Sequence, residues 1–419
     1  MQRLIIPGLA LFLLLPSAPA QTGADGSTPL HWASYRDDLA AADKLIRAGV
    51  NVNAANDLGA TALWAASQNG SSAMVRKLLA AGANPNLALL AGETPLMVAA
   101  RSGYPDVAEQ LCAKDANVNA RGARGQTALM WAVSQKHPEV VKVLLAHHAD
   151  LKIRSGVYHE VQAVSPHGVD EYNKALPHGG DTALMFAARS GDFESVKLLV
   201  AAGADVNDAD AWGVSATIMA AHAGFDDIVD FFLEKGANPN AGAGFTALHI
   251  AVMRRDEKMA AALLNHGADA NAPLRTWTPT RRSSHDYNFE PALVGATPFW
   301  MAARFTEPGM MRLLVKHGAD PLFVHHAEYV AGASFQRRKE TTNALQAAVG
   351  LGTGTPWVVL PRAEREKPTL EAVKLLVELG IDVNAAGPGG RTALDSAQVL
   401  RFNGVAEFLA AKGAVTSSR

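Results

Sequence analysis

The chain has almost none of the residues that build covalent or metal frameworks. Cys112 is the only cysteine among 419 residues, which excludes a disulfide within the chain, a zinc site made of several cysteines and a C-x-x-C-H haem attachment. Cys112 lies in the apolar helical stretch 107–112, so we expect it to be a small buried side chain. Aromatic residues make up only 6% while Ala, Leu and Gly are plentiful, a mixture that suits short helices packed closely together.

The chain also lacks an excess of charge of either sign. Lys and Arg total 38 and Asp and Glu total 40, so a nucleic-acid partner held by bulk positive charge is not expected. Hydrophobic residues make up 48% and charged residues 19%, which predicts a folded chain with a large core.

Long apolar runs are missing except near the N-terminus. Arg3 precedes the apolar run 4–15, which is shorter than the roughly 20 residues needed to span a bilayer as a helix. Ala18-Pro19-Ala20 then offers small residues where a signal peptidase cleaves. We expect residues 1–20 to be a secretory signal peptide and the protein to be exported, periplasmic or secreted, with no integral membrane segment after cleavage. A retained N-terminal anchor is the alternative, and the near absence of disulfide potential favours a bacterial periplasm.

A repeated motif organises the rest of the chain. Thr28-Pro29-Leu30-His31 recurs at Thr61, Thr94 and Thr127, each 33 residues after the last. Within each copy, the Thr motif is followed first by small residues, then by a V-x-x-L-L pattern, and then by the sequence Gly-Ala-Asn/Asp-x-Asn. Six further copies bring the total to ten and begin at Thr182, Ser215, Thr246, Thr297, Asn343 and Thr392.

Each copy predicts a pair of short helices. Thr caps the first helix, and Pro at the next position already has a helical φ. Val and Leu at 3–4 spacing form one apolar stripe on the second helix, and Gly ends it. One pair cannot bury its stripe alone, so the pairs should stack.

These motifs resemble the ankyrin repeat, over nearly all of residues 25–414. The resemblance implies an all-α solenoid of stacked helix-turn-helix units joined by hairpin-like fingers. It further implies a non-catalytic scaffold that binds partner proteins through its concave face and its fingers.

Breaks in the period divide the chain into segments. Three insertions fall between one repeat and the next and should lengthen fingers on one side, whereas 350–368 falls between the two helices of a repeat and should project from the opposite side. The expected segments after the signal peptide are 21–153 (repeats one to four), 154–178 (insertion), 179–271 (repeats five to seven), 272–294 (insertion), 295–321 (repeat eight), 322–340 (insertion), 341–386 (repeat nine), 387–414 (capping repeat) and 415–419 (tail).

Candidate partner-binding residues follow from the register. The position seven residues after the repeat Thr should line the concave groove, and it holds Tyr35, Arg101, Arg189 and Arg304. The resemblance places Arg124, Trp212 and Phe245 at finger tips, where partners bind. Trp, Tyr and Arg often dominate interface energies, although exposed arginines are also commonly just solvated.

No enzyme signature is present, and we expect neither a catalytic site nor a cofactor. His147, His266 and His317 should lie at the C-termini of second helices, and His31 and His249 should be hydrogen-bonded structural residues. The alternative hypothesis is a metal-dependent or enzymatic protein whose site is built from the inserted loops, chiefly His159, His167 and His178, although their spacing matches no known metal motif. A purely structural element of an envelope assembly is a third possibility, and we expect a monomer while leaving the oligomeric state open.

Overall fold

The computed structural model describes residues 23–163, 173–278, 289–331, 336–355 and 359–417. It divides into two compact units, residues 1–150 and 151–419, and each is described by itself. In the described part of the chain, no helix is both long enough and apolar enough to cross a membrane.

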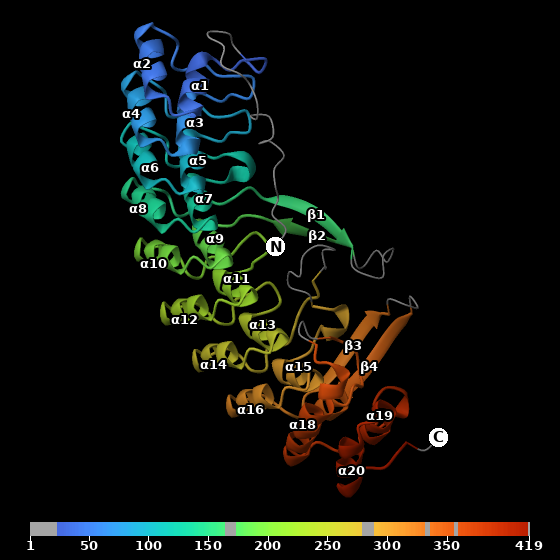
Figure 1. Cartoon of the computed structure of the whole chain (residues 1–419). Helices are drawn as coiled ribbons and strands as arrows, with labels where there is room; N and C mark the ends of the chain where they lie inside the picture. The colour runs from blue at the N-terminus through green and yellow to red at the C-terminus, as the bar shows by residue number, and fades with distance from the viewer. Residues whose placement is uncertain (1–22, 164–172, 279–288, 332–335, 356–358, 418–419) are drawn as a thin grey trace. The chain divides into compact units, whose positions relative to one another are not determined.

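Unit 1 consists of helix pairs whose first helices form one row and whose second helices form another (Figure 1). The pairs are α1 (Pro29–Tyr35) with α2 (Leu39–Arg47), α3 (Ala62–Asn69) with α4 (Ser72–Ala80), α5 (Pro95–Ser102) with α6 (Pro105–Cys112), and α7 (Ala128–Ser134) with α8 (Pro138–Ala146).

Unit 2, taken by itself, has the same two-row arrangement of helix pairs (Figure 1). Its pairs are α9 (Ala183–Ser190) with α10 (Phe193–Ala201), α11 (Ala216–Ala223) with α12 (Asp226–Glu234), α13 (Ala247–Arg254) with α14 (Glu257–Asn265), α15 (Pro298–Arg304) with α16 (Pro308–Lys316), α17 (Ala344–Ala348) with α18 (Glu366–Glu378), and α19 (Ala393–Leu400) with α20 (Asn403–Ala411). The predicted solenoid of stacked helix pairs is therefore confirmed.

The helix ends follow from the repeated motif. The Thr61 hydroxyl accepts a hydrogen bond from the Trp64 backbone N at 3.2 Å, and Thr94 caps α5 through Met97 N at the same distance. Gly70 ends α3 at φ +71°, and a Cβ there would lie 2.5 Å from the Tyr104 ring. Glycine is thus required at this position by both its backbone angle and its close approach to a neighbouring side chain.

The core of each unit lies between the two rows of helices. Val75 and Leu78 of α4 are fully buried, as the apolar stripe predicts, and the paired alanines Ala99 and Ala100 let neighbouring first helices approach closely. Cys112 is buried as expected, and burial raises the pKa of its thiol to about 12, which keeps it protonated and unreactive.

Asparagines of the repeated Asn-x-Asn turn join each repeat to the next. The Asn86 side chain donates to the Asp115 carbonyl at 2.9 Å and accepts from Asn117 N at 2.7 Å. Four asparagines of unit 2 make the same pair of hydrogen bonds to the following repeat: Asn207, Asn240, Asn271 and Asn384.

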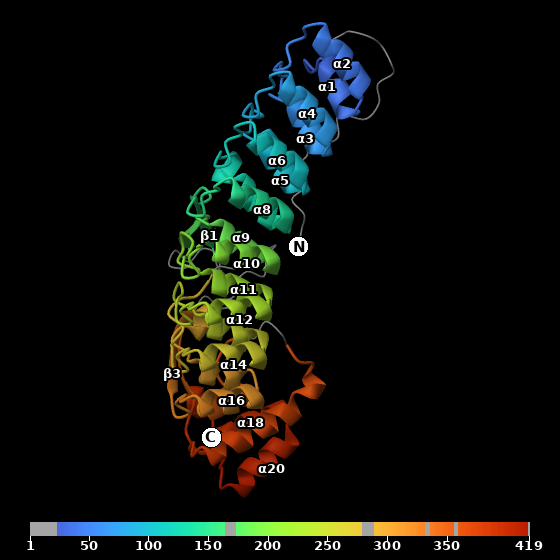
Figure 2. The ribbon, with the colours of Figure 1, turned by 90° about the vertical axis from the view of Figure 1, so that its left-hand side faces the viewer.

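Two of the insertions form antiparallel β-hairpins, which the sequence analysis did not predict as strands. β1 (Tyr158–Ala163) pairs with β2 (Asn173–His178), and β3 (Val324–Val330) pairs with β4 (Arg337–Asn343). Within unit 2, β1 and β3 lie at the edge where the loops between repeats gather, and the segment leading into α18 projects on the side away from β3 (Figure 2).

Candidate functional site

The surface formed by the first helices, here called the first-helix face, carries paired cationic and aromatic side chains in unit 1. The Arg101 guanidinium forms an ion pair with Glu93 and lies 5.6 Å from the centre of the Trp131 ring. Burial raises the pKa of Glu93, and the positive charge of Arg101 partly offsets this effect. Arg101 is therefore held in place over an aromatic ring while part of its side chain remains exposed.

Two other predicted contact residues of unit 1 reach solvent. Tyr35, at the end of α1, is 40% exposed and meets Trp32 edge-on, with ring centres 6.5 Å apart. Arg124 is exposed in the short 3₁₀ turn η1 (Ala123–Gly125), where its φ of +59° turns the finger. Both positions are accessible to a partner, and their role in binding stays a prediction.

Unit 2 repeats the cation–aromatic arrangement at Arg189. Its guanidinium bonds Asp181 at 2.8 Å and lies 5.7 Å from the centre of the Phe186 ring. Nearby, Asp210 accepts from Trp212 N at 2.9 Å and thereby shapes the finger that presents Trp212. Burial raises the pKa of Asp210 to about 6, and the carboxylate of Asp181 adds to this effect.

The expectation that Phe245 is an exposed finger-tip contact is wrong. Phe245 is 1% exposed, because its ring packs against Phe289 with centres 5.2 Å apart and against Trp212 at 5.6 Å. Phe289 comes from the insertion that follows this repeat, so the inserted segment covers the finger. Trp212 keeps a half-buried position at the edge of this cluster.

Arg304 does not lie open on the first-helix face as the register suggested. Its Nε is buried without a hydrogen-bond partner among the described residues, and its side chain lines a cavity together with Arg255 and Arg365. Sequence analysis did not single out these two arginines. Arg255 occupies a helix end at φ +61°, a position that holds Gly in five of the ten repeats, and Arg365 belongs to an insertion, so neither stood out clearly from the pattern.

The histidines predicted to be structural occupy the expected positions. His147, His266 and His317 are the C-cap residues of α8, α14 and α16, which confirms their predicted placement. His31 Nδ1 lies 2.8 Å from the Thr28 hydroxyl and His31 Nε2 lies 2.7 Å from the Ala60 carbonyl oxygen, as expected for a structural histidine.

His249 is the buried counterpart of His31. Its Nδ1 lies 2.9 Å from the Thr246 hydroxyl, and its side chain is fully buried. Burial lowers the pKa of His249 to about 4, against a smaller opposing effect of the neighbouring Ala272 carbonyl and Asp269. The imidazole is therefore neutral near pH 7 and serves the helix cap.

The alternative metal site would be built chiefly from His159, His167 and His178. Among the described residues, no three His, Cys, Asp or Glu side chains gather closely enough to hold a metal ion. His178 of β2 stacks on Tyr158 with ring centres 5.3 Å apart, and His159 is on β1. His167 lies outside the described residues.

The chain is similar to parts of larger proteins. It is 38% identical over 78 residues to the mitochondrial disaggregase of Bos taurus, covering 19% of this chain and 11% of that protein, and 36% identical over 78 residues to the human protein, with the same coverage. It is 30% identical over 144 residues to an ankyrin repeat and KH domain-containing protein of Caenorhabditis briggsae, covering 33% of this chain and 5% of that protein. The chain thus spans about a tenth or less of these relatives.

A solved structure and a family model give further matches. The crystal structure of the human ASB11 ankyrin repeat domain matches with a TM-score of 0.46 and 26% identity, covering 57% of this chain and 98% of that one. The family model described as ankyrin repeats (3 copies) matches residues 7–88, 81–155 and 184–274, which is more than half of the chain. Together with the repeated motif and the stacked helix pairs, this match shows that the chain belongs to the ankyrin repeat family.

Proposed function

We propose that this protein is a scaffold that holds partner proteins on the first-helix face and the fingers of its ankyrin repeats, in an extracytoplasmic compartment. Ankyrin repeats indicate protein–protein interaction, and the fold is typically not enzymatic.

The observation that carries the proposal is the pairing of arginines with aromatic rings on the first-helix face. Arg101 over Trp131 in unit 1 and Arg189 near Phe186 in unit 2 are each held by an acidic residue, at 30% and 49% side-chain exposure. Because ion pairs and ring contacts already order these side chains, binding a partner would cost little conformational entropy. Arginine next to aromatic surface is also a typical composition for the centre of an interface.

The extracytoplasmic location rests on residues 1–20 alone. Arg3, the apolar run 4–15 and Ala18-Pro19-Ala20 have the layout of a secretory signal peptide. Fusing residues 1–25 to a reporter enzyme and fractionating bacterial cells tests the location. We expect export and a mature N-terminus at Gln21, whereas a cytoplasmic reporter with an intact N-terminus would contradict it.

Crosslinking of the tagged full-length chain in its native compartment, followed by mass spectrometry, tests the interaction. Arg101→Gln and Arg189→Gln should reduce crosslinking to the partner. The matched controls Lys142→Gln and Lys197→Gln remove one positive charge each from the second helices α8 and α10. Both lysines bond a glutamate on their own helix, and Lys197 also lies 4.9 Å from the centre of the Phe193 ring, so it tests a cation–aromatic pair away from the first-helix face. Equal loss in all four variants, or in none, would contradict binding on the first-helix face.

A further inference from the structure

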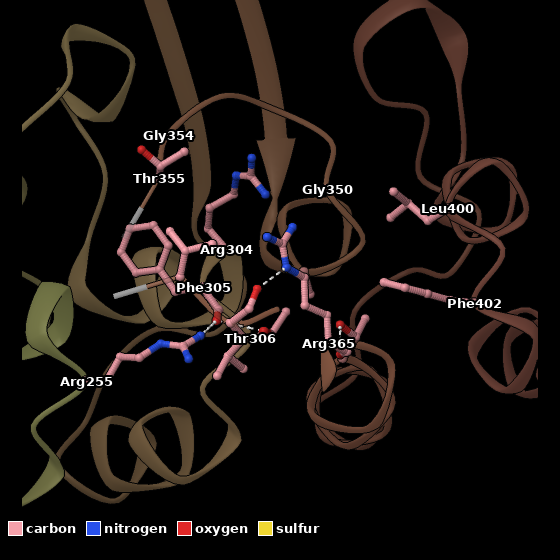
Figure 3. Close-up of a pocket in the computed structure, with 14 residues that line it drawn as sticks. Arg255, Arg304, Phe305, Thr306, Gly350, Gly354, Thr355, Arg365, Leu400 and Phe402 are labelled. Atoms are coloured by element: carbon pink, nitrogen blue, oxygen red, sulfur yellow. Dashed lines mark hydrogen bonds between the residues drawn. The ribbon is translucent and has the colours of Figure 1, made fainter. Parts of the chain in front are cut away.

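A cavity of about 280 Å³ lies in unit 2 where three parts of the chain meet. The end of α15 forms one wall, described residues between α17 and α18 (Gly350, Gly354, Thr355, Val359, Leu360 and Arg365) line a second, and the junction of α19 and α20 forms a third (Figure 3). The residues that line it include the three arginines already noted: Arg255, Arg304 and Arg365.

Arg255 is already neutralised by its surroundings. Its guanidinium donates to the Phe305 carbonyl at 2.5 Å and forms an ion pair with Glu307 at 2.5 Å. Both side chains of this ion pair are largely buried, at 12% and 14% exposure. Arg255 therefore lines the cavity as a paired side chain whose charge is already balanced by Glu307.

Arg304 and Arg365 have no such counterion. Among the described residues, neither guanidinium has a carboxylate oxygen within 4.0 Å, and the buried Arg304 Nε has no hydrogen-bond partner. Arg365 uses its Nε to donate to the Leu360 carbonyl at 2.8 Å and is exposed. In Figure 3 the two guanidinium groups face the same space, Arg304 from α15 and Arg365 from the start of α18.

The nearby carboxylates are committed to other hydrogen bonds. Glu290 accepts from the Thr355 hydroxyl, and Glu340 accepts from the hydroxyls of Tyr329, at 2.8 Å, and Thr353, at 3.3 Å. Burial lowers the pKa of Arg304. The charges of Glu290 and Glu340 oppose this effect, and the smaller effect of the like charge of Arg365 adds to it. A desolvated guanidinium beside a second one is costly unless an anion lies between them.

The remaining lining is mostly apolar, with three threonines among it: Thr306, Thr355 and Thr369. Phe305 and Phe402 are buried in the cavity wall, and Leu360 and Leu400 complete that surface. The cavity is also much larger than a single inorganic anion needs, since one water molecule occupies about 30 Å³ of liquid. A space of this kind suits an organic molecule with one charged end.

We propose that this cavity binds a small organic anion, with its carboxylate or phosphate group between Arg304 and Arg365 and its apolar part against Phe402 and Leu400. The planar donor fork of arginine matches the oxygens of both groups, and two forks converging on one anion give charge-assisted hydrogen bonds on two sides. Neither Arg101 nor Arg189 lines this cavity, so the site adds a ligand to a protein-binding scaffold.

Isothermal titration calorimetry of the purified full-length chain tests the site with three probes: phenyl phosphate, phenylacetate and inorganic phosphate. We expect saturable 1:1 binding of at least one aromatic anion, tighter than that of inorganic phosphate. Comparing phenyl phosphate with phenylacetate decides between a phosphate and a carboxylate. Arg304→Gln and Arg365→Gln should each weaken binding by about tenfold or more.

Arg312→Gln is the matched control, because Arg312 is exposed on α16 and does not line the cavity. Its binding should equal that of the unmodified chain. If Arg304→Gln does not fold by circular dichroism, the exposed Arg365→Gln variant still decides the question. No saturable binding of either aromatic anion, inorganic phosphate binding as tightly as both, or unchanged binding in Arg365→Gln would overturn the proposal.

Discussion

The side-chain amide of Asn271 donates to the Gly318 carbonyl at 2.8 Å, although 47 residues separate the two. In an uninterrupted part of the stack, Asn240 makes the same bond to Gly267 over 27 residues. The long insertion between Asn271 and Gly318 therefore leaves the repeat-to-repeat hydrogen bonds unchanged. The chain has added finger length without altering how its repeats stack.

Replacing these asparagines should measure the coupling between repeats. Asn240→Ala and Asn271→Ala each remove one donated and one accepted bond to the next repeat, and each should lower the free energy of unfolding by about 1–3 kcal/mol. Denaturant unfolding followed by circular dichroism provides the measurement. Because the bonds are equivalent, the two losses should be similar.

Asn238→Ala is the control for this prediction. The Asn238 side chain accepts only from Asn240 N, two residues away, so its loss weakens one turn without removing a side-chain bond between repeats. Asn238→Ala should lower the free energy of unfolding by about 0.5–1.5 kcal/mol. A cost in Asn238→Ala equal to that in Asn240→Ala would show that the asparagines act locally and would refute their coupling role.

Replacing Phe245 with alanine should lower the free energy of unfolding far more than a change at an exposed finger tip would. Phe245→Ala removes a fully buried ring from its packing against Phe289 and should destabilise unit 2 by about 3–5 kcal/mol. Trp212→Ala should cost less, because Trp212 is only half-buried. Thermal unfolding of both variants gives the comparison. Equal stability of Phe245→Ala and the unmodified chain would show that the inserted segment does not cover this ring.

The buried imidazole of His249 makes stability depend on pH. Its pKa is about 4 in the folded chain and about 6.5 when exposed, so the unfolded state binds more protons between these values. The contribution of the neutral His249 to the free energy of unfolding is complete above pH 6.5. It is lost progressively as the pH falls towards 4, by roughly 3 kcal/mol in total.

His249→Gln isolates this effect. Glutamine should keep the helix cap, because Gln346 occupies the same position in α17 and its side chain accepts from Asn343 N at 2.9 Å. Unlike histidine, a glutamine side chain does not bind a proton in this pH range. The stability of the unmodified chain relative to this variant should therefore fall between pH 6.5 and 4. If the stability of His249→Gln falls with pH in parallel with that of the unmodified chain, the buried imidazole does not cause the pH dependence.

The sequence predicted the parts of the fold that depend on local signals. Thr94, Gly70 and the Val75–Leu79 stripe set the ends and the buried faces of their helices within one repeat, so a 33-residue pattern was sufficient to place them. The hairpins escaped prediction because β1 and β2 pair through backbone bonds that carry no repeated side-chain signal.

The candidate site residues were predictable only where their contacts lie within the regular repeats and no insertion folds onto them. Arg101 and Arg189 follow the register and lie on the first-helix face, each with its acidic partner eight residues earlier in the chain. Phe245 is covered by Phe289, and Arg304 shares its cavity with Arg365, which lies 61 residues later in the sequence. In both cases an insertion supplies the second residue, and the sequence spacing does not show where an insertion folds back.

The central claim is that the first-helix face binds a protein, and the most direct measurement is the affinity of the crosslinked partner, once identified, for the purified chain. Surface plasmon resonance with the unmodified chain, Arg101→Gln, Arg189→Gln and the control Lys142→Gln would give it. At least one arginine variant should bind about tenfold more weakly, while the control binds as the unmodified chain does. Unchanged affinity in both arginine variants would contradict the claim.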